Sequence, residues 1–346
     1  MPPSAPFAVM DTFASAAFTG SPTAAVLLPG NEWPADEALA KLALEFNHGE
    51  TALLLRGFSA DAERRAVGED LDLAAAERFR LRWFRPDGGE DELCVPAGPL
   101  PNHRALTDSP PPLTRRCGHG TLASSSYLVL SGTVAHDATM AFETLSGVLY
   151  ARAKNGDGQG RREGRPAELL GEQVTMEVLL PASPPAAVPE EMACTLADAL
   201  GVDRAAVLYA GHTGLDDDFV TLGTRAEVAA LKPDLVKVND LGHRGLIVTA
   251  PEDNGDVEAD FVSRAFFPTC GIPEDLITGS THCSLGPYWA GELGKDELVG
   301  QQIPFGSGAR GGYVEVRVVD QKSVALGGLS VVSTAGSILM PADTPV

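Results

Sequence analysis

The sequence is poor in positive charge and lacks long apolar runs. Of its 346 residues, 26 are Lys or Arg and 47 are Asp or Glu, so the formal net charge is −21. A protein that tracks nucleic-acid phosphates needs clustered Lys and Arg, and this chain has no such run. It also has no stretch of about 18 apolar residues, the length that spans a bilayer. We therefore expect neither a nucleic-acid partner nor a membrane span.

Cysteine pairs and metal-binding motifs are also missing. The cysteines are Cys94, Cys117, Cys194, Cys270 and Cys283. They form an odd set without a CxxC pair, and the first residues lack the charged and apolar regions of a signal peptide, which predicts a reduced, cytoplasmic protein. The histidines include no HExxH motif and no dense His/Cys cluster at metal-ligand spacing. We therefore expect no metal site.

Motifs for nucleotide binding and for nucleophilic catalysis fail in context or do not occur. Residues 306–311 match GxGxxG, but a strand-like stretch at 313–316 follows where a dinucleotide-binding fold requires a helix. The chain has no GxSxG elbow and no Walker loop. Cys117 and Cys283 stand near predicted helix starts, where small packing residues are more common than thiol nucleophiles. We therefore expect no cofactor.

The patterns that are present indicate an α/β protein. At about 150 residues per domain, the length predicts two domains. Apolar residues at helical spacing predict a helix over Pro34–Phe46, and Arg78–Trp83 alternates charged and apolar residues as a half-buried strand does. Because each half holds several strands and a glycine-opened helix, we place the domains at residues 1–146 and 147–346.

Two polar stretches interrupt this pattern, and one short motif recurs. Residues 85–116 are rich in proline and residues 154–166 are rich in glycine, so both are expected to be inserted loops. Gly118–Leu122 is similar to Gly279–Cys283, and each segment begins a predicted helix. This similarity suggests an internal duplication.

The two glycine-opened helix starts could each bind an anion. Backbone N–H groups and the positive end of the helix dipole bind a carboxylate there without a side-chain cation. A single glycine at such a position more often serves only a tight turn. Two such starts, one with His119 and one with Ser280, favour a cleft between the halves that grips a small acidic molecule from two sides.

Four polar side chains are candidates for chemistry in that cleft. Glu50 lies between a helix end and an apolar strand, where partial burial would suit it to exchange a proton with carbon, although most such Glu residues are only solvated. His119 could hydrogen-bond a substrate or cap its helix. Asp275 and Ser280 are separated by a turn that could bring both to one face, or Asp275 is a simple turn residue. The pattern alone leaves these alternatives open.

Several short motifs follow one another in an order that resembles a known family. They are Phe18–Pro22, Gly49–Thr51, Arg82–Phe84, Cys117–Ala123, Glu274–Ser280, Pro287–Trp289, Gly300–Gln302 and Arg310–Gly312. Their order resembles the phenazine biosynthesis PhzF-like family over nearly the whole chain. The resemblance implies a diaminopimelate-epimerase-like fold, in which two similar domains each wrap a curved mixed sheet or barrel around a central helix. It also implies a homodimer and no cofactor.

The resemblance further implies roles for individual residues. Glu50 would be the general acid/base that carries the proton. The residues that would polarise and orient the substrate are His119, Asp275 and Ser280. The residues that would contact the substrate are Gly118, Gly120, Thr121, Gly279 and Ser21.

This chain departs from the family pattern in three places. Ser21 replaces the usual Asn of a Gly-Asn-Pro turn, and Gly120 replaces the usual Ala, which bears on substrate contacts rather than on proton transfer. In the family, the strand that contains Arg82 runs almost directly into the Cys-Gly-His motif. Because removal of residues 95–117 would restore that arrangement, this segment is either a late insertion or a retained intron.

The function that these observations favour is cofactor-independent isomerisation. A small carboxylate would be held by the two helix starts while Glu50 removes a proton from one carbon and returns it at another. One alternative is an amino-acid epimerase on the same fold, which would be expected to use a matched pair of bases. The other alternative is a non-catalytic binding or interaction protein that kept the fold.

Overall fold

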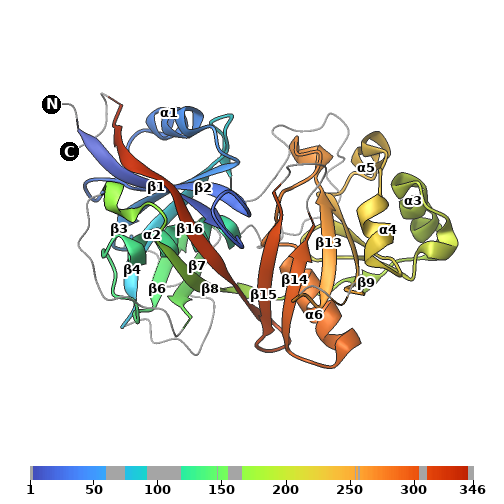
Figure 1. The fold of residues 1–346 in the computed structure, drawn as a ribbon. Helices are drawn as coiled ribbons and strands as arrows, with labels where there is room; N and C mark the ends of the chain where they lie inside the picture. The colour runs from blue at the N-terminus through green and yellow to red at the C-terminus, as the bar shows by residue number, and fades with distance from the viewer. Residues whose placement is uncertain are drawn as a thin grey trace. The chain divides into compact units, whose positions relative to one another are not determined.

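The computed structural model describes residues 3–59, 75–91, 118–145, 147–154, 166–253, 255, 258–303 and 310–341. These residues form two compact units, whose elements are labelled in Figure 1. Unit 1 contains the described residues up to 91, those from 118 to 180 and those from 325 onward, and unit 2 contains those from 181 to 324. Among the described residues, no helix is long and apolar enough to cross a membrane.

The boundary between the units lies later than residues 146 and 147, where the sequence analysis divided the chain. β7 (Gly147–Ala153) pairs with β6 (Met140–Thr144), and β8 (Gln173–Pro181) pairs with β7, so this part of the chain stays in unit 1. After unit 2 the chain re-enters unit 1, where β16 (Ser323–Leu339) pairs with β1 (Ser4–Thr12). Hydrogen bonds between strands distant in sequence set these limits, and no local pattern encodes them.

The strands of unit 1 form a closed barrel (Figure 1). Neighbours pair in the order β1, β2, β3, β4, β6, β7, β8 and β16, and β16 pairs back with β1. A closed ring leaves no open strand edge. The short β5 (Glu90–Asp91) pairs with β4 outside this ring. The other strands of the ring are β2 (Ser21–Leu27), β3 (Glu50–Arg56) and β4 (Glu77–Phe84).

α2 (Gly118–Leu130) is the central helix of this barrel. It packs against β1, β2, β3 and β7, and nearly all of its residues are buried. Three consecutive serines, Ser124–Ser126, can lie in this core because each hydroxyl donates a hydrogen bond to a backbone carbonyl of the same helix. A helix enclosed on all sides needs no polar stripe, so a nearly uniform small and apolar sequence suffices.

α1 (Asp36–Phe46) leads the chain into the part of the barrel that holds Glu50. It packs against β3 and β4, and its residues Leu39 and Leu42 join a buried cluster with Leu53. Asn47 ends the helix in the left-handed conformation, with φ at 49°. This helix and its end confirm the prediction made from the apolar spacing.

Unit 2 is a mixed sheet with helices packed on it. The strands are β9 (Ala186–Ala187), β10 (Tyr209–His212), β11 (Asp217–Thr221), β12 (Gly245–Pro251), β13 (Phe261–Phe266), β14 (Glu297–Gln302) and β15 (Gly312–Val318). The helices are α3 (Glu190–Leu200), α4 (Arg225–Ala230), α5 (Leu235–Asp240) and α6 (His282–Leu293). α6 packs on β14 and β15, while α4 packs on β12 and β13. Short 3₁₀ helices lie at Pro166–Leu169 in unit 1 and at Arg204–Ala206 and Pro268–Cys270 in unit 2.

The two units repeat one order of strand pairing. From β1 to β7 along the unit 1 barrel the pairs are antiparallel, parallel, antiparallel, parallel and antiparallel. From β10 to β15 in unit 2 the same five pairings recur in the same sequence. The second parallel connection contains α2 in unit 1 and α6 in unit 2. This repeat agrees with the duplication predicted from the similar helix starts, and it confirms the predicted mixed α+β class.

Not every element that the sequence indicates is confirmed. The apolar residues of Ala206–Tyr209 predict a strand, but this prediction is wrong in position, because Arg204–Ala206 is a 3₁₀ turn and β10 begins only at Tyr209. The carboxylate of Asp203 accepts a hydrogen bond from the backbone of Ala205 and caps this turn. Of the two expected loops, residues 92–117 and 155–165 lie outside the described residues.

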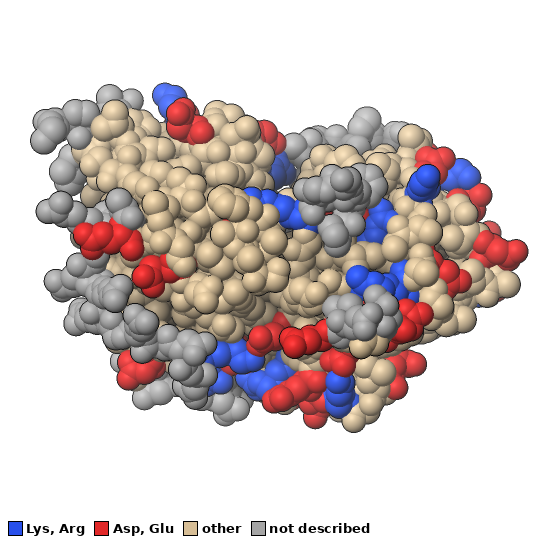
Figure 2. All heavy atoms as spheres, viewed as in Figure 1, with Lys and Arg blue, Asp and Glu red and all other residues tan. Residues whose placement is uncertain are grey.

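Charged side chains are intermixed on the surface. Figure 2 shows Lys and Arg lying among Asp and Glu over the face that it draws. Some of these charges form ion pairs, such as Arg204 with Glu190 and Lys237 with Asp198, each at 2.7 Å. Exposed pairs of this kind contribute little to stability.

Candidate active site

Glu50 is held at the first position of a buried strand. It follows the left-handed end of α1, and the parallel register of β2 and β3 places it opposite Thr23. Only 4% of its side chain is exposed. The carboxylate therefore lies within unit 1 rather than in bulk solvent. Partial burial of this side chain is the condition that the sequence analysis set for proton exchange.

The carboxylate of Glu50 meets the imidazole of His119. His119 is the second residue of α2, and its Nε2 lies 2.9 Å from Oε2 of Glu50. Its side chain is 21% exposed, so the pair is open to solvent on the histidine side. A carboxylate and an imidazole at this distance can share and pass a proton.

Gly120 leaves room for this pair. A Cβ atom built on Gly120 would lie 2.6 Å from Oε2 of Glu50 and 2.6 Å from Cδ1 of the Trp83 indole. Real Cβ atoms do not approach other atoms so closely, so alanine here would displace Glu50, Trp83 or both. The Nε1–H of Trp83 is buried beside Gly120 and has no hydrogen-bond partner among the described residues. An indole donor without a partner at this place could bind an acceptor atom of a ligand.

Ser21 is the first residue of β2 and directly follows a turn. Gly20 has φ at +67°, and a Cβ there would collide with the carbonyl of Thr12, so this turn requires glycine. The Thr12 hydroxyl donates a 3.1 Å hydrogen bond to the carbonyl of Ser21. Ser21 is buried at this point, and its predicted contact with a substrate stays a prediction.

In unit 2, Asp275 belongs to a hydrogen-bonded loop before α6. The Thr278 hydroxyl donates to Oδ2 of Asp275 at 2.6 Å. The Gln302 side chain donates from Nε2 to the Asp275 carbonyl and accepts the Thr278 backbone N–H, both at 2.8 Å. These bonds hold the loop in one conformation ahead of the helix.

Ser280 lies next to a buried ion pair. Arg244 binds Asp217 with two hydrogen bonds, one of them from Nε to Oδ1 at 2.6 Å, and its Nη1 donates to Oγ of Ser280 at 3.2 Å. Complete burial raises the pKa of the Asp217 carboxyl, while the paired guanidinium opposes that rise. Because Oγ of Ser280 accepts from Arg244, its own O–H is oriented to donate elsewhere.

The first turn of α6 also buries a histidine. Nδ1 of His282 lies 2.8 Å from the carbonyl of Thr278, whereas Nε2 is buried without a partner in the part of the chain that the structure describes. Burial lowers the pKa of His282 to about 4, despite this hydrogen bond. His282 is therefore neutral near pH 7.

The predicted site residues fall into two sets, one in each unit. In unit 1 the structure brings Glu50, His119 and Gly120 together, and Gly118 and Thr121 are buried in the same helix start. In unit 2, Asp275 and Ser280 have separate partners, Thr278 and Arg244. Gly279 is buried, and its carbonyl accepts the backbone N–H of His282 at 3.0 Å, which begins the helical bonding of α6.

Sequence reasoning missed Arg244, Asp217 and Trp83. Arg244 and Asp217 lie 27 residues apart, and only the parallel pairing of β11 with β12 makes them neighbours. The signal that could have found Arg244 is its place just before an apolar strand, the same place that Glu50 takes. Trp83 was assigned only to a strand, because periodicity does not reveal which buried polar atom lacks a partner.

The similarity of this chain to known proteins covers both units. The family profile described as phenazine biosynthesis-like protein, PhzC-PhzF, matches residues 115–336. An uncharacterized isomerase of Pseudomonas aeruginosa is 32% identical over 318 residues, covering 92% of this chain and 93% of that protein. Phenazine biosynthesis-like domain-containing protein 2 of Mus musculus is 30% identical over 347 residues, covering 96% and 98%. A solved PhzF-family structure from Enterococcus faecalis has a TM-score of 0.70 at 26% identity, covering 97% and 99%.

Proposed function

Because the chain belongs to the PhzC-PhzF family of phenazine biosynthesis-like proteins, we propose that it is a cofactor-independent isomerase of a small carboxylate-bearing metabolite. The observation that carries this proposal is the 2.9 Å pair of Glu50 and His119 at the start of α2. A buried carboxylate with one accessible proton partner is suited to remove a proton from carbon and to return it. A positioned acid/base of this kind contributes about 10² to 10⁴ in rate.

In the proposed reaction Glu50 acts as a base and then as an acid. Its carboxylate removes a proton from one carbon of the substrate, and the electron pair of that C–H bond shifts into the conjugated system next to the substrate carboxylate. The protonated Glu50 then delivers the proton to a second carbon, which moves the double bond. His119 orients the Glu50 carboxylate and donates a hydrogen bond while negative charge develops on the substrate.

The substrate carboxylate requires hydrogen-bond donors, and the chain offers two kinds. The start of α2 presents the backbone N–H groups of Gly118, Gly120 and Thr121, with the positive end of the helix dipole. The O–H of Ser280, oriented by Arg244, is the donor that we assign from unit 2, and Asp275 lies five residues earlier in the chain.

The arrangement of unit 2 favours an isomerase over an epimerase. A racemase or epimerase that inverts a carbon through two bases needs a proton carrier on each face of that carbon. Glu50 is the first residue of β3, which pairs in parallel with β2, and the corresponding place in unit 2, just before β12, holds Arg244. A guanidinium remains protonated in proteins and cannot serve as the second base.

Glu50→Gln is the direct test of this function. Wild-type protein is first incubated in D₂O with small carboxylates that carry an acidic or allylic C–H bond, such as but-3-enoate, longer unsaturated acids and both enantiomers of amino acids. Proton NMR identifies a carboxylate whose C–H signal is lost or shifted. For that compound, we expect Glu50→Gln to lower kcat by at least about 100-fold, because an amide cannot accept the proton.

The control is Glu45→Gln, which removes an exposed carboxylate from α1 and should leave kcat unchanged. Calorimetry with the same compound should show that Glu50→Gln still binds it. Full activity in Glu50→Gln would contradict the assignment of Glu50. A wild-type protein that binds carboxylates but never alters their C–H signals would instead be a binding protein, and inversion at a single carbon would indicate an epimerase. Homodimer formation stays a prediction of the family resemblance, and a cytoplasmic location stays a prediction from the cysteines and the first residues of the sequence.

A further inference from the structure

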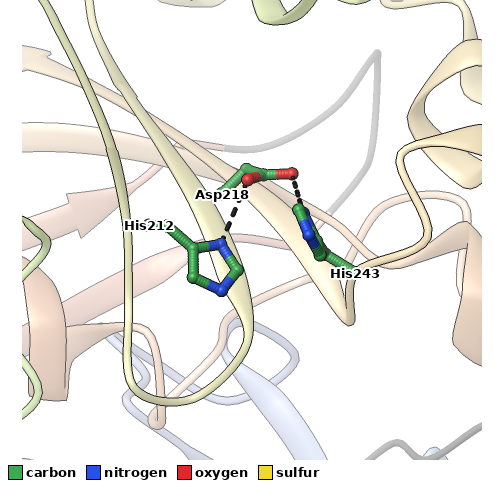
Figure 3. Close-up of side chains that lie close together, drawn as sticks. All are labelled: His212, Asp218 and His243. Atoms are coloured by element: carbon green, nitrogen blue, oxygen red, sulfur yellow. Dashed lines mark hydrogen bonds and ion pairs between the residues drawn. The ribbon is translucent and has the colours of Figure 1, made fainter. Parts of the chain in front are cut away.

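Two histidines and one aspartate of unit 2 converge at a place that the proposed reaction does not use. His212 is the last residue of β10, Asp218 is the second residue of β11, and His243 lies in the turn before β12. The antiparallel register of β10 and β11 sets His212 directly opposite Asp218. Figure 3 shows both imidazoles pointing at this carboxylate, one toward each oxygen. The three side chains therefore come from three neighbouring segments of one sheet.

The distances within this cluster are short. Nδ1 of His212 lies 3.2 Å from Oδ1 of Asp218, and Nδ1 of His243 lies 2.8 Å from Oδ2. The two imidazole rings are 4.5 Å apart between centroids. One ligand atom from each residue can be chosen so that all three lie within 4.8 Å of one another.

The negative charges of Asp217 and Asp218, the two adjacent aspartates of β11, are compensated by different groups. Both carboxylates are fully buried, and a buried carboxylate needs a compensating charge. Asp217 has the permanent positive charge of Arg244. Asp218 instead faces two imidazoles, each with a third of its side chain exposed. Imidazole nitrogens can present either a proton or a bound cation to a carboxylate.

We propose that His212, Asp218 and His243 form a binding site for one divalent transition-metal ion of the Zn²⁺ type. Two ligand atoms that each lie about 2.1 Å from one ion, at angles near 90–110°, are about 3.0 to 3.4 Å apart. The two nitrogen-to-oxygen distances of the cluster are close to this spacing, so an ion fits after small side-chain movements. Two imidazoles and one carboxylate are a common protein ligand set for Zn²⁺, whereas Mg²⁺ and Ca²⁺ prefer oxygen ligands.

A neighbouring carboxylate supports this site independently. Metal-bound histidines usually donate their second ring N–H to a carboxylate or carbonyl, which fixes the ring. Oδ1 of Asp216 lies 3.4 Å from Nε2 of His212, the nitrogen that faces away from Asp218. Asp216 is fixed in turn, because its backbone N–H donates to the carbonyl of Thr213 at 3.1 Å and its φ is 66°. The structure thus supplies both the ligands and an outer carboxylate that would orient one of them.

The site goes beyond the proposed isomerase and takes no part in its proton transfer. It is linked to Ser280 only through chain neighbours, since Asp218 follows Asp217 and His243 precedes Arg244. Spacing in the sequence predicted no metal site, because 6 and 25 residues separate the ligands from Asp218 and only strand pairing unites them. A bound ion would join the ends of β10 and β11 to the start of β12.

Metal titration of the full chain tests the proposal. The probes are Co²⁺, followed by its visible absorption, and Zn²⁺, followed by competition with a chelating dye, both after removal of bound metal with EDTA. We expect one equivalent to bind. His212→Gln, His243→Gln and Asp218→Asn should each weaken binding by more than about 100-fold, and Asp216→Asn by about 10- to 100-fold. His136→Gln, in unit 1, is the matched control and should bind like the wild type.

Several results would overturn the proposal. One is wild-type protein that binds no Co²⁺ or Zn²⁺ at micromolar concentration. Another is binding that persists unchanged in His212→Gln and His243→Gln, or that shows the intense near-ultraviolet band of a Co²⁺–thiolate bond, which would place the ion on cysteine. Asp216→Asn keeps the test valid if the other variants fail to fold, because its side chain is 60% exposed. Unchanged metal affinity in a folded Asp216→Asn protein would contradict the role of this carboxylate in orienting His212.

Discussion

The two units share one order of strand pairing, but the charged residue near the start of α2 is acidic and the one near the start of α6 is basic. In unit 1 the strand after the first parallel connection begins with Glu50, which touches His119 of α2. In unit 2 the residue before the corresponding strand is Arg244, which touches Ser280 just ahead of α6. A carboxylate can release and accept a proton near neutral pH, whereas a guanidinium cannot. The repeated frame therefore supplies one proton carrier and one fixed cation.

This difference assigns separate tasks to the two helix starts. Arg244 is bound on two sides, by the buried Asp217 and by Ser280, so its charge is part of the stability of unit 2. Glu50 pairs with the partly exposed His119, whose imidazole can pass a proton to it. We therefore expect substitutions at Arg244 to act on stability first and substitutions at Glu50 to act on turnover first.

Arg244→Gln should have the largest effect on folding. It leaves the fully buried Asp217 carboxylate without its cation, and breaking a buried pair in this way costs about 3–5 kcal/mol. The measurement is the free energy of unfolding from urea denaturation. The matched control is Arg152→Gln, whose pair with Glu177 is half-exposed on the arginine side and should cost no more than about 1 kcal/mol. Equal losses for both variants would contradict the role given to Arg244.

Gly120→Ala should have the next largest effect, and its effect falls on turnover. The added methyl group would meet Oε2 of Glu50 and the Trp83 ring, and a displacement of about 1 Å at a reacting group can cost about 100-fold in rate. Steady-state kinetics with the carboxylate found by NMR would measure this loss. Gly291→Ala is the matched control in α6, because its Cβ would meet no atom within 4 Å. A Gly120→Ala protein as active as Gly291→Ala would show that Glu50 does not need this space.

The third prediction concerns His282, the buried histidine in the first turn of α6. His282 is fully buried with a pKa of about 4, so below pH 6.5 the unfolded chain binds a proton that the folded protein does not. Its contribution to stability is therefore complete above pH 6.5 and declines as the pH falls toward 4, by about 2 kcal/mol between pH 7 and pH 5. Urea denaturation should show a smaller decline for His282→Gln than for the wild type. Parallel declines in the two proteins would contradict this assignment.

Local patterns predicted the elements but not the partners that complete each site. The turn from α1 into β3 could be read from helical spacing and from the residues Asn47–Gly49, and it put Glu50 in the right place. The motif order then gave roles to Glu50 and His119, and the structure shows that the two side chains lie 2.9 Å apart. By contrast, Arg244 and Asp217 meet through the register of β11 and β12, which depends on the whole sheet.

The length of β16 and the space around Gly120 also depend on contacts between residues distant in sequence, which local patterns do not reveal. The apolar pattern predicts a strand only near Val324–Gly327, but β16 runs on to Leu339 because it completes the barrel by pairing with β1. Gly120 was predicted as a substrate contact and noted as a departure from the usual alanine. Its physical reason, the closeness of Glu50 and Trp83, exists only after β3, β4 and α2 have packed together.

The measurement that most directly tests the account is the rate at which the substrate C–H bond breaks in wild type and in Glu50→Gln. Both proteins are saturated with the same carboxylate in D₂O, and the C–H signal is followed by NMR while calorimetry verifies binding. The account predicts steady loss of that signal with the wild type and at least about 100-fold slower loss with Glu50→Gln. Equal rates in the two proteins would contradict it, because the proton would then be carried by another group.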